Sequence, residues 1–494
     1  MTSELASGRR ESPPSDQILV GVRRPTVGLM KRLARGLGID MAVGLSMLTR
    51  ICGGAIAPLT LLFVTSALTQ AEQGYYYTFS GVAGLSMFVE LGVGVVLTQR
   101  FAAEYAQLRW TPDGTLDGPA RSLGRLGSLF RKATYWYLGV AAVTIPLLLV
   151  AGDVMFDGSA EGVTWRGPWV LMLLLVTAQV VPAPVQSLLA SCGRVSEVAR
   201  LGFTNLLVST LALWAGLTMG VGLYAVAIPL AATLTVTCVW LFPPNRRLLR
   251  DLWAAGRVGP TVSWWRECFP LQWRVAITWL SAYLGYQALT PIVFGLLGPV
   301  AAGQFGMSLN INYSLYALGF TWLHVRLPVF VALAASGRFR EFERHLLKTA
   351  TLAVGLVVVI GVGLVVGLVL LGELGSRYAD RILSPLPFAC LTASTVCNII
   401  IFAFGTYARS LQKESLFAVN LVVGFGMCMG TWLVCQLGGE LESVSVSLLA
   451  VNLVCGVGGG AWVCSHLRRQ VAGRPSSDQI ESPSSYIPEP SPER

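Results

Sequence analysis

Apolar segments recur along almost the whole chain, and each is long enough to cross a lipid bilayer. An α-helix needs about 20 apolar residues to span the hydrocarbon layer. The sequence therefore predicts an all-α polytopic membrane protein with about twelve transmembrane helices. The predicted spans are residues 41–67, 76–99, 133–152, 168–190, 200–218, 221–243, 269–296, 302–323, 348–372, 386–408, 415–437 and 443–465.

The composition supports this prediction. Hydrophobic residues make up 54% of the 494 residues and charged residues only 13%, whereas soluble proteins carry about 25% charged residues. The apolar surface exceeds what one globular core could bury. Residues 1–40 are polar and basic without a separate apolar core, so we expect the first span to act as the targeting signal.

Basic residues concentrate on one side of the predicted membrane arrangement. Of the 36 lysines and arginines, only Arg166, Arg377 and Arg381 lie in loops assigned to the other side. Because cytoplasmic segments are enriched in Lys and Arg, we expect a multi-pass protein of the cell inner membrane with both termini in the cytoplasm. The net charge of +10 is then a consequence of membrane topology, and no nucleic-acid partner is expected.

The predicted spans divide into two sets of six. A basic cytoplasmic linker at residues 244–268 separates a first bundle at 41–243 from a second at 269–465. Leu59–Tyr77 and Leu289–Met307 occupy corresponding places in the two halves and share a Leu-Thr pair, an apolar run and a glycine-aromatic cluster. Twelve spans in two related halves are a common transporter plan.

The two ends of the chain are rich in charged residues, and Ser and Pro are frequent in both. We expect a basic cytoplasmic tail at residues 1–40 and a disordered cytoplasmic tail at 466–494. Within the first tail, residues 26–40 place leucines on one helical face and basic residues on others. This pattern fits a short interfacial helix on anionic lipid, and it fits an ordinary basic flank of the first span equally well.

Three charged residues lie well inside the predicted spans, away from the span ends, and a charge at the bilayer centre costs about 2.5–3.5 kcal/mol. Arg50 and Glu90 lie at similar depths in a helical hairpin. Either they form a structural ion pair, or Arg50 faces a cavity and Glu90 positions it or titrates. Arg274 either reaches back to the membrane surface or lies in a central wet cavity. A guanidinium grips phosphate through two parallel hydrogen bonds, so the cavity interpretation favours an anionic lipid head group.

Uncharged polar side chains are densest in spans seven and eight. Gln272, Asn310 and Asn312 are the residues there that we expect to contact substrate. Such groups usually join membrane helices by hydrogen bonds. A sugar, which is dense in hydroxyl groups, would also bind to this lining.

Motifs for catalysis or for a bound cofactor are missing from the sequence. The three histidines lack metal-ligand spacing, and there is no GxxxxGK[ST] phosphate-binding loop. The predicted outer loops are too short for a catalytic domain. We therefore expect a transporter without catalytic residues, metal or cofactor, driven by an ion gradient, the membrane potential or the substrate's own gradient.

Short motifs in both halves resemble those of one transporter family. They are Leu68–Phe79 (LTQAEQGYYYTF), Glu90–Gly92 (ELG), Phe269–Arg274 (FPLQWR), Thr290-Pro291 and Ala302–Gln304 (AGQ). In these motifs the chain resembles the Wzx-type polysaccharide and O-antigen flippases, within the multidrug/oligosaccharidyl-lipid/polysaccharide (MOP) exporter superfamily. The resemblance implies two pseudo-symmetric six-helix bundles around a central cationic cavity, a MATE-like architecture.

The resemblance also implies a substrate. An oligosaccharide linked to undecaprenyl diphosphate would move from the inner to the outer leaflet by alternating access, for lipopolysaccharide or exopolysaccharide biosynthesis. Arg50 and Arg274 would hold the diphosphate. Membrane lipids, a polysaccharide polymerase and glycosyltransferases are the expected partners.

Two other functions remain open at this point. A multidrug or cation antiporter of the same fold would need an acidic and aromatic cavity, and Glu90 is the only acid inside a predicted span beside two arginines. A membrane glycosyltransferase or ligase would need a larger outer domain than the predicted loops provide.

Overall fold

The computed structural model describes residues 41–84, 92–157, 162–376, 378–411, 413 and 415–472. Within these residues the secondary structure is helical except for one antiparallel hairpin of β1 (Arg109–Trp110) and β2 (Leu116–Asp117). Ten helices there are long and apolar enough to cross a membrane, or eleven if a bent pair counts as one span. The predicted all-helical membrane class is therefore confirmed.

The second predicted span, residues 76–99, falls on an interruption of the described chain. Helices α3 (Gln70–Ala83) and α5 (Val93–Tyr105) lie on either side of residues 85–91, so this span is neither confirmed nor contradicted. Glu90, residues 1–40 with the expected interfacial helix, and residues 473–494 also lie outside the described residues.

The first half comprises the helices up to α10. Besides α3 and α5 these are α2 (Met41–Ala67), α6 (Ala120–Phe156), α7 (Arg166–Ala178), α8 (Ala183–Ser191), α9 (Val195–Thr218), η1 (Gly222–Val226) and α10 (Ala227–Leu241). The linker folds into the amphipathic helix α11 (Arg246–Val258) and the π-helical turn η2 (Trp264–Cys268).

The second half begins with α12. Its elements are α12 (Phe269–Tyr286), α13 (Leu289–Leu297), α14 (Pro299–Val325), α15 (Leu327–Ala335), α16 (Phe339–Glu373), η3 (Ala379–Arg381), α17 (Pro385–Ser410), α18 (Phe417–Gln436), α19 (Leu441–Val451), η4 (Asn452–Gly458) and α20 (Gly459–Ala472). Helix α20 continues to Ala472, past residue 466 where the predicted cytoplasmic tail begins.

Two predicted spans are broken near prolines. The span at 168–190 is divided into α7 and α8 at a turn that contains Pro182, since proline has no backbone N–H for a helical hydrogen bond. The span at 269–296 bends by 42° between its α12 and α13 parts, just before Pro291. The second break matters for the site because α12 lines a cavity described below.

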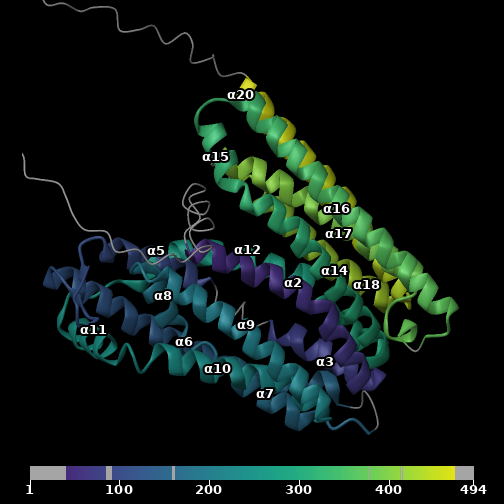
Figure 1. Cartoon of the computed structure of the whole chain (residues 1–494), viewed down its shortest axis with the longest axis horizontal. Coiled ribbons are helices and arrows are strands. Elements are labelled where there is room, and N and C mark those ends of the chain that lie inside the picture. Colours follow the sequence, from purple (N-terminus) through teal and green to yellow (C-terminus); the bar gives the residue numbers. More distant parts are fainter. Residues whose placement is uncertain are drawn as a thin grey trace, which may run out of the picture.

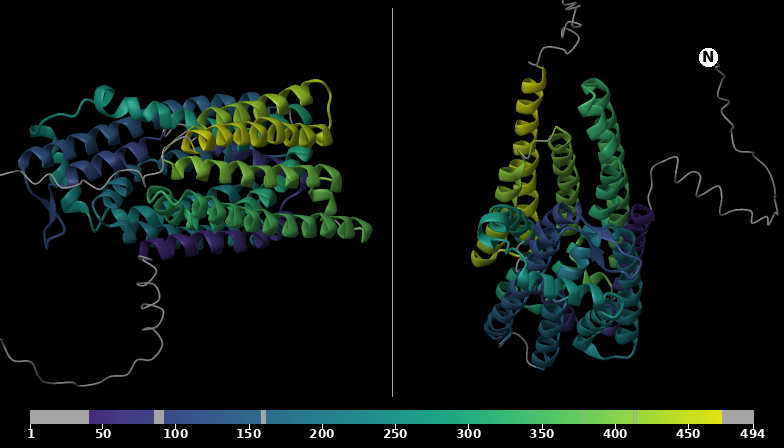
Figure 2. Two further views of the ribbon diagram at one scale, coloured as in Figure 1. Left: turned by 90° about the horizontal axis from the view of Figure 1, so that it is seen from above. Right: turned by 90° about the vertical axis from the view of Figure 1, so that its left-hand side faces the viewer.

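The two halves lie side by side with their long helices running in similar directions (Figures 1 and 2). In Figure 1 the ribbons diverge towards α5 and α15 and converge towards α3 and α14. We call the end where α2 begins and α20 ends the tail end, and the opposite end the far end.

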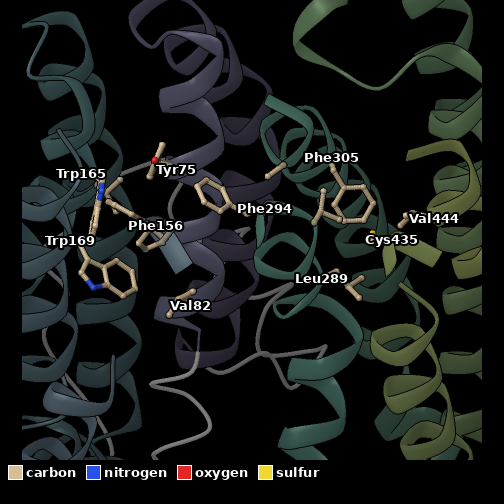
Figure 3. Packing of buried hydrophobic residues seen from close by; sticks show 14 of the residues in the cluster. Tyr75, Val82, Phe156, Trp165, Trp169, Leu289, Phe294, Phe305, Cys435 and Val444 are labelled. Atoms are coloured by element: carbon tan, nitrogen blue, oxygen red, sulfur yellow. The ribbon is translucent and has the colours of Figure 1, made fainter. Parts of the chain in front are cut away.

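The hydrophobic core follows the same arrangement. At the far end one core joins both halves: Tyr75 and Phe156 of the first half pack on Phe294 of the second, with ring centroids 4.9 and 5.1 Å apart (Figure 3). At the tail end the described residues form two cores. One contains Phe101 and Leu252 of the first half and the linker, with Leu271 of α12 packed against it, and the other contains Phe342 and Ile399 of the second half. The largest core shared by both halves among the described residues is thus the one at the far end.

Close backbone contact seals the far end. A Cβ on Gly74 of α3 would lie 1.9 Å from the carbonyl oxygen of Pro299 at the start of α14, so no larger residue fits without a shift. Next to it, the Gln73 amide donates hydrogen bonds to the carbonyl oxygens of Gly303 and Arg381, both 3.0 Å away. Small residues permit such close helix packing in membrane proteins.

Candidate substrate-binding cavity

A cavity of about 490 Å³ lies inside the second half, between α12, α14, α17 and α18. We call it the second-half cavity. The residues that line it are Trp279, Ser281, Ala282, Tyr283, Gly285, Tyr286, Gln287, Tyr313, Tyr316, Asn398, Ile401, Phe402, Gly405, Arg409, Asn420, Val423, Gly424 and Met427. This lining combines four tyrosines and three amide side chains with one arginine, and it includes no aspartate or glutamate.

A continuous series of aromatic rings leads from this cavity towards the tail end. Tyr286 contacts Tyr313 and Tyr316 at centroid distances of 5.8 and 6.5 Å, and Tyr316 is 5.9 Å from Phe320 on the same helix. Phe320 then packs on Phe402 of α17 at 4.5 Å. The path therefore consists of aromatic rings, and three of them carry hydroxyl groups. A sugar ring can stack on such rings and form hydrogen bonds with the hydroxyl groups.

Two arginines from different halves lie on the last two rings of this path. The Arg50 guanidinium carbon of α2 is 5.5 Å from the centre of Phe320, and that of Arg409 is 4.9 Å from the centre of Phe402. Cation–π contact of this kind positions a guanidinium over the face of a ring. Both residues are solvent-exposed.

His324 adds a third nitrogen-containing side chain to the same place. Its ring stacks on Phe320 at 5.2 Å, and it lies near enough to Arg50 and Arg409 to interact with both charges. We call Arg50, Arg409 and His324, with the rings of Phe320 and Phe402, the cationic mouth. Its positive charge comes from both halves of the protein, so its geometry depends on how the halves are arranged.

Arg50 lies over Phe320 but is not among the residues that line the second-half cavity, and the other residues predicted from the sequence are scattered. Arg274 of α12 is exposed, with its guanidinium 5.8 Å from the ring of Trp273. It is not among the residues that line the second-half cavity. The predicted partnership of Arg50 with Glu90 cannot be followed, because Glu90 is outside the described residues.

Two predicted contact residues are buried between helices. Gln272 is 1% exposed, and its amide oxygen accepts a hydrogen bond from the Trp264 indole at 3.1 Å. Asn312 is 2% exposed and accepts a hydrogen bond from Thr395 of α17 at 3.2 Å. Both side chains therefore join parts of the structure, the common role of polar groups in membrane helices.

Asn310 occupies a different place from Asn312. It is exposed and lines a smaller hollow of about 230 Å³ between α2, α3 and α14, together with Thr60, Tyr76 and Ser80. This hollow lies between the halves, so Asn310 remains available to a ligand although it is not in the second-half cavity.

Arg409 was missed by the sequence reasoning, which assigned it to the basic flank of the predicted span 386–408. A signal was present: Asn398, Phe402, Gly405 and Arg409 recur at intervals of four, three and four, so they share one helical face, and all four line the cavity. If the helical spacing of Asn398, Phe402 and Gly405 had been extended past the predicted end of the span, Arg409 would have been grouped with them.

No protein-family model matches the sequence, and no curated protein matches it. Solved structures do resemble it. An inward-facing multidrug resistance MATE family transporter of the MOP superfamily aligns with a TM-score of 0.59 and 12% identity, over 86% of this chain and 99% of that one. The lipid II flippase MurJ in an inward closed conformation aligns with a TM-score of 0.59 and 10% identity, over 85% and 87%.

A third structure, an outward-facing MATE family transporter, aligns with a TM-score of 0.50 and 14% identity, over 87% of this chain and 96% of that one. At such low identities the likeness shows the fold. The chain therefore shares the fold of these MATE and MurJ structures, and the predicted MATE-like architecture is confirmed.

Proposed function

We propose that this protein is a flippase that moves a polyprenyl-diphosphate-linked oligosaccharide across the cell inner membrane for polysaccharide biosynthesis. The observation that carries the proposal is the cationic mouth: two arginines, one from each half, on a single aromatic pair at the edge of a tyrosine- and amide-lined cavity. A diphosphate is the ligand chemistry that paired guanidinium groups bind best.

In this proposal each part of the substrate contacts a different part of the protein. The diphosphate binds Arg50 and Arg409, and the sugars extend over Tyr286, Tyr313 and Asn398 of the second-half cavity. Arg274 supplies a further cation on α12, as the sequence resemblance implies. The polyprenyl chain remains in the lipid beside the two halves.

The orientation follows from the distribution of basic residues. We place the tail end, with the start of α2, the end of α20 and α11, in the cytoplasm, because that end carries most of the lysines and arginines among the described residues. Substrate then enters from the inner leaflet while the far end is sealed. Closure of the tail end and separation of α3 from α14 would release it to the outer leaflet, an alternating-access cycle.

The neighbouring MurJ and MATE structures are consistent with two substrate classes, a lipid-linked precursor and small drugs. The alternative function is a multidrug or cation antiporter. The lining of the second-half cavity favours the lipid-linked anion, because its one charged residue is Arg409 and a cation would be repelled there.

A reconstituted flipping assay tests the proposal. The full-length protein is placed in proteoliposomes with a fluorescent polyprenyl-diphosphate disaccharide, and dithionite quenching reports the fraction that changes leaflet. Arg50→Ala and Arg409→Ala should each slow flipping by about tenfold or more, because one charge-assisted contact contributes about 1.5–3 kcal/mol. Arg344→Ala, an exposed residue of α16, is the matched control.

The outcome can contradict the proposal clearly. Unchanged flipping in both cavity variants, with normal reconstitution, would remove the role of the cationic mouth. Drug efflux by the wild-type protein together with no movement of the lipid probe would establish the antiporter instead.

A further inference from the structure

A second hollow lies away from the cationic mouth, on the outside of the first half at the tail end. Its volume is about 640 Å³, and it is enclosed by α6, α8, the end of α10 and the linker helix α11. Phe130, Val185 and Phe242 supply apolar walls, while Arg250, Trp253 and Arg257 of α11 form one side. We call this hollow the tail-end groove.

The arginines of the groove are arranged as a pair. Arg250 and Arg257 are seven residues apart on α11, so they lie on the same helical face about 10 Å apart along its axis. Both are exposed, and neither takes part in any of the ion pairs found among the described residues. The groove therefore combines an apolar interior with uncompensated positive charge at its edge.

The groove is held in a fixed shape by tight packing of α11 on α6. Leu248 and Leu252 are each 1% exposed, and a Cβ on Gly127 would lie 2.2 Å from the carbonyl oxygen of Leu252. Arg131 of α6 also fixes α11. It donates a 2.8 Å hydrogen bond to the Gly256 carbonyl, and its guanidinium carbon lies 5.5 Å from the centre of the Trp253 ring.

The position of the groove decides what can fill it. Its residues Phe130, Val185 and Phe242 lie near the tail-end limits of predicted spans, so we expect the groove at the boundary between lipid and water, where tryptophans such as Trp253 are enriched. The apolar chain of a phospholipid matches the apolar walls of the groove. Its charged head group matches the basic edge formed by α11. Zwitterionic head groups carry no net charge, whereas the paired arginines select a net negative one.

We propose that the tail-end groove binds one anionic phospholipid of the adjacent leaflet. An acyl chain packs against Phe130, Val185 and Phe242, and the phosphodiester lies between Arg250 and Arg257. The lipid would fix the linker helix to the membrane as well as to the first half. This site is separate from the proposed transport path and does not depend on the proposed substrate.

Native mass spectrometry of the full-length protein tests the proposal. The protein is released from nanodiscs of phosphatidylglycerol or of phosphatidylcholine, and the retained lipids are counted and titrated. The wild-type protein should retain one phosphatidylglycerol in preference to phosphatidylcholine. Arg250→Gln with Arg257→Gln should weaken this retention about thirtyfold, the factor that corresponds to about 1 kcal/mol for each of two basic side chains near an anionic lipid.

Two further variants make the test specific. Arg246→Gln with Arg247→Gln removes the same charge from exposed positions of α11 outside the groove and should leave retention unchanged. Ala254→Trp, which fills the groove, should abolish retention while keeping both arginines. If the double glutamine variant is not recovered folded, the single variants Arg250→Gln and Arg257→Gln should each lose about fivefold.

Three results would overturn the proposal. Equal retention of phosphatidylcholine would show that the arginines do not select the lipid. Equal losses in the groove variant and in the Arg246/Arg247 control would show general attraction to an anionic surface. Unchanged retention in Ala254→Trp would place the retained lipid elsewhere.

Discussion

The two ends of this protein bring its halves together in different ways. At the far end, backbones meet at Gly74 and Pro299 and aromatic rings of both halves pack on one another. At the tail end α12 packs against the first-half core through Leu271, and Arg50 and Arg409 lie on a shared aromatic pair. Close packing without charge stabilises a contact, whereas two like charges oppose closure until an anion lies between them.

This difference suggests how substrate could drive the proposed cycle. A diphosphate between the arginines neutralises their repulsion and favours closure of the tail end. A ligand shifts a conformational equilibrium only by its differential affinity for the two states. The far-end contacts must then be overcome by that binding energy, so changes at the two ends should have different and separable effects.

The largest effect is expected from removing both arginines of the cationic mouth. Arg50→Ala with Arg409→Ala should weaken binding of a polyprenyl diphosphate by two to four orders of magnitude, on the basis of about 1.5–3 kcal/mol for each charged contact. Titration of the fluorescent lipid with purified protein measures this. The two arginines should be coupled, so the combined loss should differ from the product of the single losses; strict additivity would argue against one shared diphosphate.

A smaller effect is expected from the far-end seal. Gly74→Ala inserts a methyl group where the Pro299 carbonyl oxygen lies, and overpacking of this kind costs about 1–3 kcal/mol. We expect faster hydrogen–deuterium exchange at the far-end parts of α3 and α14 and unchanged exchange in α15. Gly295→Ala is the control, because nothing lies within 4 Å of the added methyl group. Similar exchange in both variants would mean that the far end is not sealed at Gly74.

The hydrogen bonds of Gln73 should contribute less than the glycine contact. Gln73→Leu removes its bonds to the carbonyls of Gly303 and Arg381, and about 1–2 kcal/mol of stability should be lost. Thermal unfolding followed by tryptophan fluorescence measures the loss. Gln304→Leu removes one bond from a more exposed side chain to the Asp380 carbonyl and should have a smaller effect; the reverse order would contradict the assignment of Gln73 to the seal.

The smallest effect is expected within the tail end of the first half. Arg125 forms 2.7 Å ion pairs with Glu104 and Glu267, and the three side chains are 20–29% exposed. Arg125→Ala should destabilise the protein by roughly 1 kcal/mol, discounted for solvent screening, and less at high salt. Melting temperatures at two salt concentrations measure this. Arg338→Ala breaks an exposed pair with Glu341 and should have almost no effect.

Sequence reasoning predicted the helical class and most of the span positions, and its errors have identifiable causes. It predicted that Gln272 and Asn312 contact substrate, but both are buried between helices. For Asn312 the cause is the pattern of α14, whose apolar residues are spread around the helix, so periodicity does not reveal which face is turned to a cavity. Arg409 was missed because a basic residue at the end of a span has the same appearance whether it faces the cytoplasm or a cavity.

The amino-acid sequence by itself determined that this chain must cross a membrane many times as helices, because long apolar segments have no other way to satisfy their backbone hydrogen bonds in lipid. It also determined that Arg50 lies in costly surroundings that need a partner or water. Only the tertiary structure decided that Arg409, more than 350 residues away along the chain, joins Arg50 on one aromatic pair. That meeting depends on how two helix bundles are packed and tilted, a property of contacts between the halves and not of any single span.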